Sequence, residues 1–172
     1  FPTVSSLGRV GEESVGGTVQ IPESERLQWY RCLSPGEETL VIPIDCEAIS
    51  RAQRAVYRPV RKDIDAFLRF ATLVTVNGVP QLRFSATTPK ITAIWTSIST
   101  LEVGERIVIK DLVVSASSGS TTARVVSGPC RVTKNILTAF ETGECKVRIS
   151  AKARQPYPKL ALTVVIAVVQ KV

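Results

Sequence analysis

Apolar and polar side chains alternate with a period of two along most of the chain after residue 65, a pattern typical of β-strands. The alternation over residues 66–76 predicts one strand, and Asn77-Gly78 after it is the dipeptide that best forms a tight hairpin turn. Residues 79–86 are the predicted return strand, weakened at its start by Pro80. Five further strands are predicted at residues 91–99, 106–115, 122–134, 144–154 and 159–172.

The first part of the chain carries different signals. Residues 1–25 are rich in Gly, Ser and Glu, and their few apolar residues have no period, which predicts a flexible N-terminal arm. Short strands are predicted at residues 26–33 and 39–44, on either side of a Ser-Pro-Gly turn. Seven or more strands at this spacing favour an all-β fold, so we expect one antiparallel β-sandwich domain over residues 26–172 behind the arm.

One short helix is predicted near the start of this domain, from about residue 47 to residue 57. Asp45 is placed to cap its N-terminus, because an aspartate side chain can accept the hydrogen bonds of the first free backbone N–H groups. Pro59 ends the helix, since a proline disfavours helical geometry in the residue before it.

Five basic residues lie on this helix and just after it, within twelve residues that contain no acid: Arg51, Arg54, Arg58, Arg61 and Lys62. Residues three and four apart are neighbours on a helix, so the first two or three would form one stripe. A row of like charges favours an anion opposite it: a phosphate backbone, an acidic lipid surface, or the acidic part of the chain itself. The alternative is a helix face open to solvent and paired with the nearby carboxylates Glu47, Asp63 and Asp65.

A cleaner basic pattern lies in the predicted strand 144–154. The even positions hold Lys146, Arg148, Ser150, Lys152 and Arg154, and the odd positions hold Cys145, Val147, Ile149, Ala151 and Ala153. Successive side chains of a strand point to opposite faces, so the four cations would line one face, with adjacent even positions about 6 to 7 Å apart. We favour contact with the phosphate backbone of a nucleic acid, independent of base sequence because stacking aromatics are sparse. The alternative is a strand face open to solvent.

The last predicted strand is apolar on both faces. Within residues 160–169 the even positions are Leu, Leu, Val, Ile and Val, and the odd positions are Ala, Thr, Val, Ala and Val. Neither face suits water, so the strand is either buried in the middle of a two-sheet core or has its second face covered by another subunit. We favour the buried central strand.

The composition excludes several kinds of catalytic and metal site, and the charge is distributed unevenly along the chain. The 172 residues carry a net charge of +7, but residues 1–50 carry −5 and the rest +12, which favours two unlike surfaces or an acidic segment that docks on a basic neighbour. The chain has no histidine, which excludes imidazole general bases and His metal ligands. Carboxylate pairs occur at Glu37-Glu38, Asp63/Asp65 and Glu102/Glu105, where turns and helix ends also carry them. We therefore expect a protein that is not an enzyme and holds no metal or cofactor.

The four cysteines are Cys32, Cys46, Cys130 and Cys145, and none forms a C-x-x-C motif. Pairing Cys32 with Cys46 and Cys130 with Cys145 would close loops of ordinary size. The sequence does not choose between disulfides and buried thiols, and we expect free thiols because no glycosylation sequon or other sign of secretion is present.

In organisation, the predicted strands of residues 26–172 resemble the single jelly-roll coat subunits of small RNA viruses. Those subunits place an N-terminal arm ahead of an eight-stranded sandwich, with a helix inserted between early strands. The resemblance implies a homo-oligomer, with many copies in a closed shell, and basic positions turned toward packaged RNA. It also implies a location in the virion and the host cytoplasm. One departure is that coat subunits often carry a strongly basic arm, whereas this arm is acidic.

Two other functions fit the same features. A viral matrix-type protein would self-associate and bind an acidic membrane through its basic face. A secreted β-sandwich with two disulfides would bind a protein or a glycan, and it would contain no free thiol.

Overall fold

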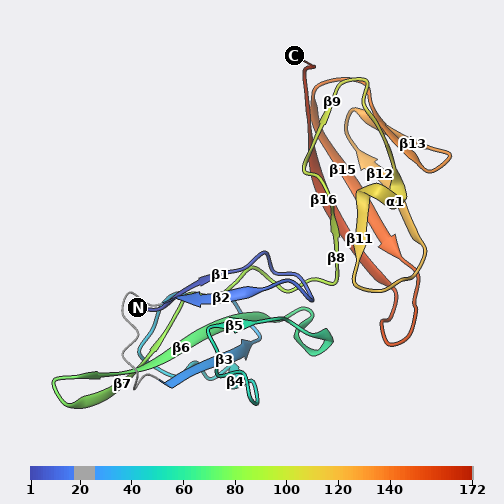
Figure 1. Cartoon of the computed structure of the whole chain (residues 1–172). Coiled ribbons are helices and arrows are strands. Elements are labelled where there is room, and N and C mark those ends of the chain that lie inside the picture. The colour runs from blue at the N-terminus through green and yellow to red at the C-terminus, as the bar shows by residue number, and fades with distance from the viewer. Residues whose placement is uncertain (18–25, 172) are drawn as a thin grey trace. The chain divides into compact units, whose positions relative to one another are not determined.

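The computed structural model describes residues 1–17 and 26–171 of the chain (Figure 1). The chain divides into two compact units, unit 1 (Phe1–Thr92) and unit 2 (Ala93–Val172). Strands account for 53% of the residues, and the short α-helix α1 spans Ile109–Leu112. The expectation of a mainly β protein with several antiparallel sheets is confirmed. Within the described residues, no helix combines the length and the apolar character needed to cross a bilayer.

Unit 1 contains a three-stranded sheet in the order β1-β2-β5 and a four-stranded sheet in the order β4-β3-β6-β7, all antiparallel. The strands are β1 (Thr3–Ser5), β2 (Ser14–Gly17), β3 (Arg26–Cys32), β4 (Cys46–Ala48), β5 (Val56–Tyr57), β6 (Phe67–Val76) and β7 (Val79–Phe84), with one turn of 3₁₀-helix, η1 (Arg61–Asp63), before β6. The predicted β6–β7 hairpin is confirmed. Asn77 and Gly78 have φ angles of 51° and 78°, the left-handed values that a tight two-residue turn requires.

The core of unit 1 gathers around Trp29 of β3 and Phe70 of β6, whose ring centroids lie 5.1 Å apart. The two residues are direct partners in the β3–β6 register, and both side chains are buried. Gly16 of β2 lies so close to the Phe70 ring that a Cβ atom at this position would overlap the ring. The three-stranded sheet therefore packs directly on the four-stranded sheet, with the aromatic cluster between them.

The described N-terminal residues are part of unit 1 rather than an arm. Residues 3–5 and 14–17 form β1 and β2, and β2 pairs in turn with β5. Residues 18–25 of the expected arm lie outside the described residues. The division of the chain at residues 92/93 also differs from the single domain expected over residues 26–172, because each unit buries its own apolar core.

The helix predicted over residues 47–57 is wrong, because long-range pairing replaces local helical hydrogen bonds. Cys46 pairs with Cys32 where β4 joins the sheet. The Trp29 N–H donates to the Ala52 carbonyl and the Ile49 N–H donates to the Trp29 carbonyl, each at 2.9 Å. The strand predicted at residues 39–44 is also absent, and only Thr39 makes a bridge, to Phe84.

Unit 2 contains a four-stranded sheet in the order β12-β15-β16-β9, a three-stranded sheet in the order β10-β14-β13 and the pair β11-β8. The strands are β8 (Ile94–Thr96), β9 (Thr100–Glu102), β10 (Arg106–Val108), β11 (Val113–Ser115), β12 (Thr121–Ser127), β13 (Cys130–Thr133), β14 (Ile136–Ala139), β15 (Gly143–Ala151) and β16 (Leu160–Val169). All pairs are antiparallel except β16–β9. The predicted strand 106–115 is interrupted by α1, and the predicted strand 122–134 is interrupted between β12 and β13.

The long strands β15 and β16 bury one face and expose the other. Cys145, Val147, Ile149 and Ala151 of β15 are buried together with Leu160, Ile166 and Val168 of β16. The odd positions of β16 are exposed: Ala161, Thr163, Val165, Ala167 and Val169. β16 is central in its sheet, as predicted, but the expectation that both of its faces are buried is wrong, because its odd-numbered side chains are exposed.

Two disulfides join the four cysteines, which overturns the expectation of free thiols. Cys32–Cys46 links the paired strands β3 and β4 of unit 1, and Cys130–Cys145 links β13 to β15 between two sheets of unit 2. Each disulfide closes a short loop within one unit. Strand pairing brings the sulfurs of Cys32 and Cys46 together, and the packing of two sheets brings those of Cys130 and Cys145 together. A sequence pattern reports neither contact.

The close contact between Gly16 and Phe70 predicts the cost of adding one methyl group. We expect Gly16→Ala to destabilise unit 1 by about 1 to 3 kcal/mol, because the new Cβ would force the sheets apart. Urea unfolding followed by Trp29 fluorescence, in a Trp95→Phe background, measures this. Val15→Ala on the same strand points outward and should change stability by less than about 0.5 kcal/mol. Equal effects of the two variants would contradict the contact.

The disulfides predict the outcome of a thiol titration. Unfolded in denaturant without reductant, the chain should present no reactive thiol, and after reduction it should present all four cysteines. Mass spectrometry of a non-reduced digest should recover Cys32 with Cys46 and Cys130 with Cys145. Four reactive thiols before reduction would contradict both bonds.

Candidate functional site

A regularly spaced group of cations lies on the exposed face of the four-stranded sheet β12-β15-β16-β9 in unit 2. Lys146 and Arg148 of β15 point away from the core because their neighbours Val147 and Ile149 point into it. Arg124 of β12 is the direct register partner of Arg148 and is also exposed. We call Arg124, Lys146 and Arg148 the basic strip.

The charges of the basic strip are not neutralised within the described residues. Residues 1–17 and 26–171 form five ion pairs, and none of them involves the strip. Directly opposite residues on antiparallel strands have Cβ atoms only about 5 Å apart, so like charges there destabilise the sheet. Arg124 and Arg148 are such a pair. An anion lying across the strip would remove this repulsion.

The predicted row of cations continues only in part beyond the strip. The strand ends at Ala151, so the alternation that orients Lys146 and Arg148 does not extend to Lys152 and Arg154. Both of these side chains are exposed, and Arg154 donates a hydrogen bond of 3.1 Å from Nη1 to the Ser118 carbonyl. These two residues extend the basic surface past the end of β15 without sharing its regular spacing.

The first basic cluster is not brought onto one face, because the helix that would align it does not form. All five side chains are exposed: Arg51, Arg54, Arg58, Arg61 and Lys62. Arg58 forms an ion pair of 2.7 Å with Glu13. The carboxylates expected to form ion pairs with this cluster pair with other cations. Glu47 and Asp63 pair with Arg31, and Asp65 pairs with Lys90.

Asp63 is a fully buried carboxylate whose oxygens are all occupied. Arg31 donates to Oδ1 from Nε at 2.8 Å and from Nη2 at 2.6 Å, while the Tyr57 hydroxyl and the Val60 N–H donate to Oδ2 at 2.8 and 2.7 Å. Burial and the hydrogen bond to Asp63 raise the pKa of Tyr57 above its usual range. Burial lowers the pKa of Arg31, but the hydrogen bonds and charges of Asp63 and Glu47 together outweigh it, so this pKa rises. The network therefore links β3, β5 and η1 inside unit 1.

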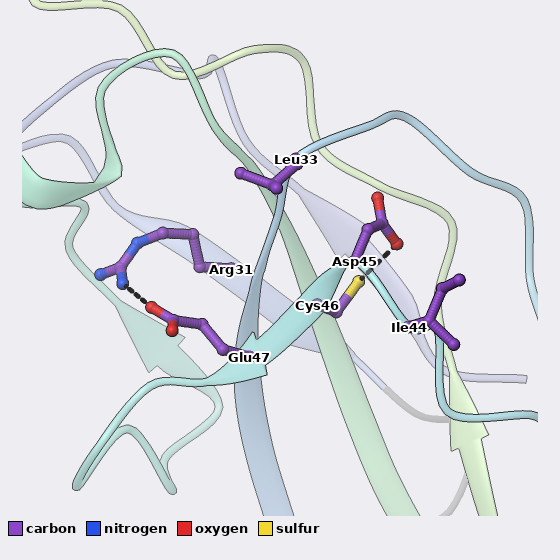
Figure 2. Close-up of a pocket in the computed structure, with 6 residues that line it drawn as sticks. All are labelled: Arg31, Leu33, Ile44, Asp45, Cys46 and Glu47. Atoms are coloured by element: carbon purple, nitrogen blue, oxygen red, sulfur yellow. Dashed lines mark hydrogen bonds and ion pairs between the residues drawn. The ribbon is translucent and has the colours of Figure 1, made fainter.

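A pocket of about 330 Å³ lies beside Cys46, which Figure 2 labels and which forms a disulfide with Cys32. Its lining residues are Arg31, Leu33, Ile44, Asp45, Cys46 and Glu47. Asp45 accepts hydrogen bonds from the hydroxyl and the N–H of Ser34, which lower the pKa of Asp45. Both carboxylates of the lining already have partners, because Glu47 pairs with Arg31 and Asp45 accepts from Ser34, so the pocket presents no unpaired charge to a ligand. The sequence analysis did not identify this pocket.

The remaining candidate sites in the part of the chain that the structure describes would use metal ligands or carboxylate pairs. That part contains no group of three or more Cys, Asp or Glu side chains able to hold a metal ion. Of the carboxylate pairs, Glu105 accepts a hydrogen bond of 2.8 Å from the Glu102 N–H within a turn. No protein family model, curated protein or solved structure matches the chain.

The burial of Asp63 predicts a large effect of neutralising it. We expect Asp63→Asn to destabilise unit 1 by about 3 kcal/mol, because Arg31 is left without its buried carboxylate partner. The matched control is Asp65→Asn, which removes an exposed ion pair and should cost less than about 1 kcal/mol. Urea unfolding followed by Trp29 fluorescence compares them. A D63N protein as stable as D65N would contradict a structural role for Asp63.

Proposed function

We propose that the protein is a non-enzymatic structural subunit that associates with copies of itself and binds nucleic acid through the phosphate backbone. The coat subunit of a small RNA virus is the example that it resembles, and a jelly-roll arrangement is part of the proposal. The proposed locations are the virion and the host cytoplasm. The two disulfides suit the virion better, because cytosolic thiols are kept reduced.

The observation that carries this proposal is the unneutralised basic strip on an exposed sheet face. Its three cations project from adjacent strands, and Arg124 and Arg148 directly oppose each other. Unit 2 as a whole has eleven basic and five acidic residues, a net charge of +6. Guanidinium and ammonium groups at this density attract a polyanion, and phosphate contacts alone carry no base specificity.

The exposed side of β16 supports self-association. Val165 and Val169 are 50% and 45% exposed, and Ala161 and Ala167 lie on the same side. Of the two interpretations of this strand, burial on both faces is excluded. The other, that a second subunit covers this face, is part of the proposal.

A second candidate function is favoured by the disulfides alone. Structural disulfides persist in oxidising surroundings, so a secreted β-rich module that binds a protein or a glycan also fits both bonds. The basic strip would then contact an acidic group of that partner. A matrix-type protein would instead use the same cations on anionic lipid.

Charge reversal of the basic strip tests the proposed function. We expect Arg124→Glu, Lys146→Glu and Arg148→Glu together to abolish retention of mixed-sequence RNA at moderate salt while the β-rich circular dichroism spectrum is unchanged. The matched control reverses three exposed cations of unit 2 outside this sheet, Arg106, Lys110 and Arg131. The control should keep most of the binding.

The absorbance ratio at 260 and 280 nm, measured across a size-exclusion peak, reports the RNA that stays bound. Equal RNA retention by the strip variant and the control would overturn the proposal. Binding to vesicles with anionic lipid but not to RNA would favour the matrix-type protein. Binding to neither would favour the secreted module.

A further inference from the structure

The segment between β3 and β4 exposes the densest set of aliphatic side chains in unit 1. We call residues 33–45 the apolar loop. Five of its side chains are each at least 54% exposed: Leu33, Leu40, Val41, Ile42 and Ile44. Scattered exposed aliphatic residues are normal, whereas five within thirteen residues concentrate apolar surface on one segment.

Covalent and hydrogen bonds hold the apolar loop in place. The Cys32–Cys46 disulfide closes its base, where the Leu33 N–H donates to the Asp45 carbonyl at 3.1 Å. Farther along, Gly36 and Thr87 exchange hydrogen bonds, and so do Thr39 and Phe84. The loop is therefore ordered before it meets a partner, which lowers the entropic cost of binding.

The sequence of the apolar loop is acidic, and the buried Arg69 guanidinium of β6 lies against Gly36 within it. Residues 32–50 contain four acids and no base: Glu37, Glu38, Asp45 and Glu47. Glu37 and Glu38 are exposed, and neither forms an ion pair within the described residues. A partner that complements this surface must combine aliphatic groups with cations. Acidic lipid and nucleic acid are excluded as partners because both carry negative charge instead of cations.

The exposed face of the four-stranded sheet in unit 2 meets both conditions. Aliphatic positions of β16 lie next to the cations of β15, with Lys146 opposite Val165 in the register and Arg148 opposite Thr163. Ala161, Ala167 and Val169 extend the aliphatic side of this face. Two exposed acids, Glu144 of β15 and Glu102 of β9, lie on the same face, in register with Ala167 and Val169. The complementarity in charge is therefore confined to the basic strip, and the apolar complementarity to the aliphatic positions beside it.

We propose that the apolar loop of one copy docks on this sheet face of a second copy, with Glu37 and Glu38 against the basic strip and Leu40, Val41 and Ile42 over β16. The proposal rests on the self-association in the proposed function and assigns the surfaces that make it. Such a contact is heterologous, so it builds rings, filaments or shells rather than a closed pair. The strip of any one copy then holds either the neighbour's carboxylates or a phosphate backbone, so a copy whose strip binds RNA joins the assembly through its apolar loop alone.

A charge-swap experiment tests the contact on the full chain. The loop variant is Glu37→Lys with Glu38→Lys, and the face variant is Lys146→Glu with Arg148→Glu. Each alone should lose self-association by more than tenfold in the association constant, because like charges then meet at every junction. A 1:1 mixture should assemble again, since every junction between unlike variants pairs opposite charges. Light scattering after size exclusion measures the mass.

An uncharged variant separates docking from nucleic-acid binding. Leu40→Ser, Val41→Ser and Ile42→Ser together should abolish assembly and leave RNA retention intact. The matched control changes three exposed valines of unit 1 outside the loop, Val56, Val60 and Val79, to serine and should assemble as the wild type does.

Three results would overturn the docking contact. They are a wild-type chain that is monomeric at every concentration without RNA, a triple-serine loop variant that still assembles, and a charge-swap mixture that stays monomeric. If RNA is still retained in any of these cases, the proposed nucleic-acid binding remains supported and only the docking contact is overturned. If the chain assembles through the loop but does not retain RNA, the docking contact is supported and the proposed nucleic-acid binding is overturned.

Discussion

The alternation of side chains along β15 and β16 is the constraint on which the rest of unit 2 depends. Because successive residues of a strand point to opposite faces, burying Val147 and Ile149 forces Lys146 and Arg148 outward. A shift of one residue in register would place both cations in the core, which is far too costly for unpaired charges. The same packing that forms the core therefore holds the basic strip in a fixed line, with no further interaction needed to orient it.

The sequence predicted those features that depend on neighbours along the chain. The period of two, the outward direction of Lys146 and Arg148, and the Asn77-Gly78 hairpin are local, and the structure has all three. The helix over residues 47–57 failed because Trp29, Tyr30 and Arg31 of β3 pair with that segment. The helix was predicted from a capping residue and a proline nearby in the sequence, and such local signals do not reveal a pairing strand far away in the chain. Pairing with β3 therefore overrode the local preference for a helix.

Features that depend on register between distant strands were not predicted. The position of Arg124 opposite Arg148 requires knowing how β12 pairs with β15, and the Cys130–Cys145 bond requires knowing how two sheets pack. The buried carboxylate of Asp63 resembled a surface acid in the sequence. The split of charge between residues 1–50 and the rest is visible in the sequence alone, and Glu37 and Glu38 belong to its acidic part while the basic strip belongs to its basic part.

The salt dependence of RNA binding tests most directly whether the basic strip neutralises phosphates. Each phosphate contact on a single strand contributes about −0.7 to the slope of log association constant against log salt, so three cations predict a slope of about −2. The measurement uses the wild-type chain and an unstructured RNA of mixed sequence, in which base identity should not matter. A slope near zero, or a strong preference for one base sequence, would contradict the account.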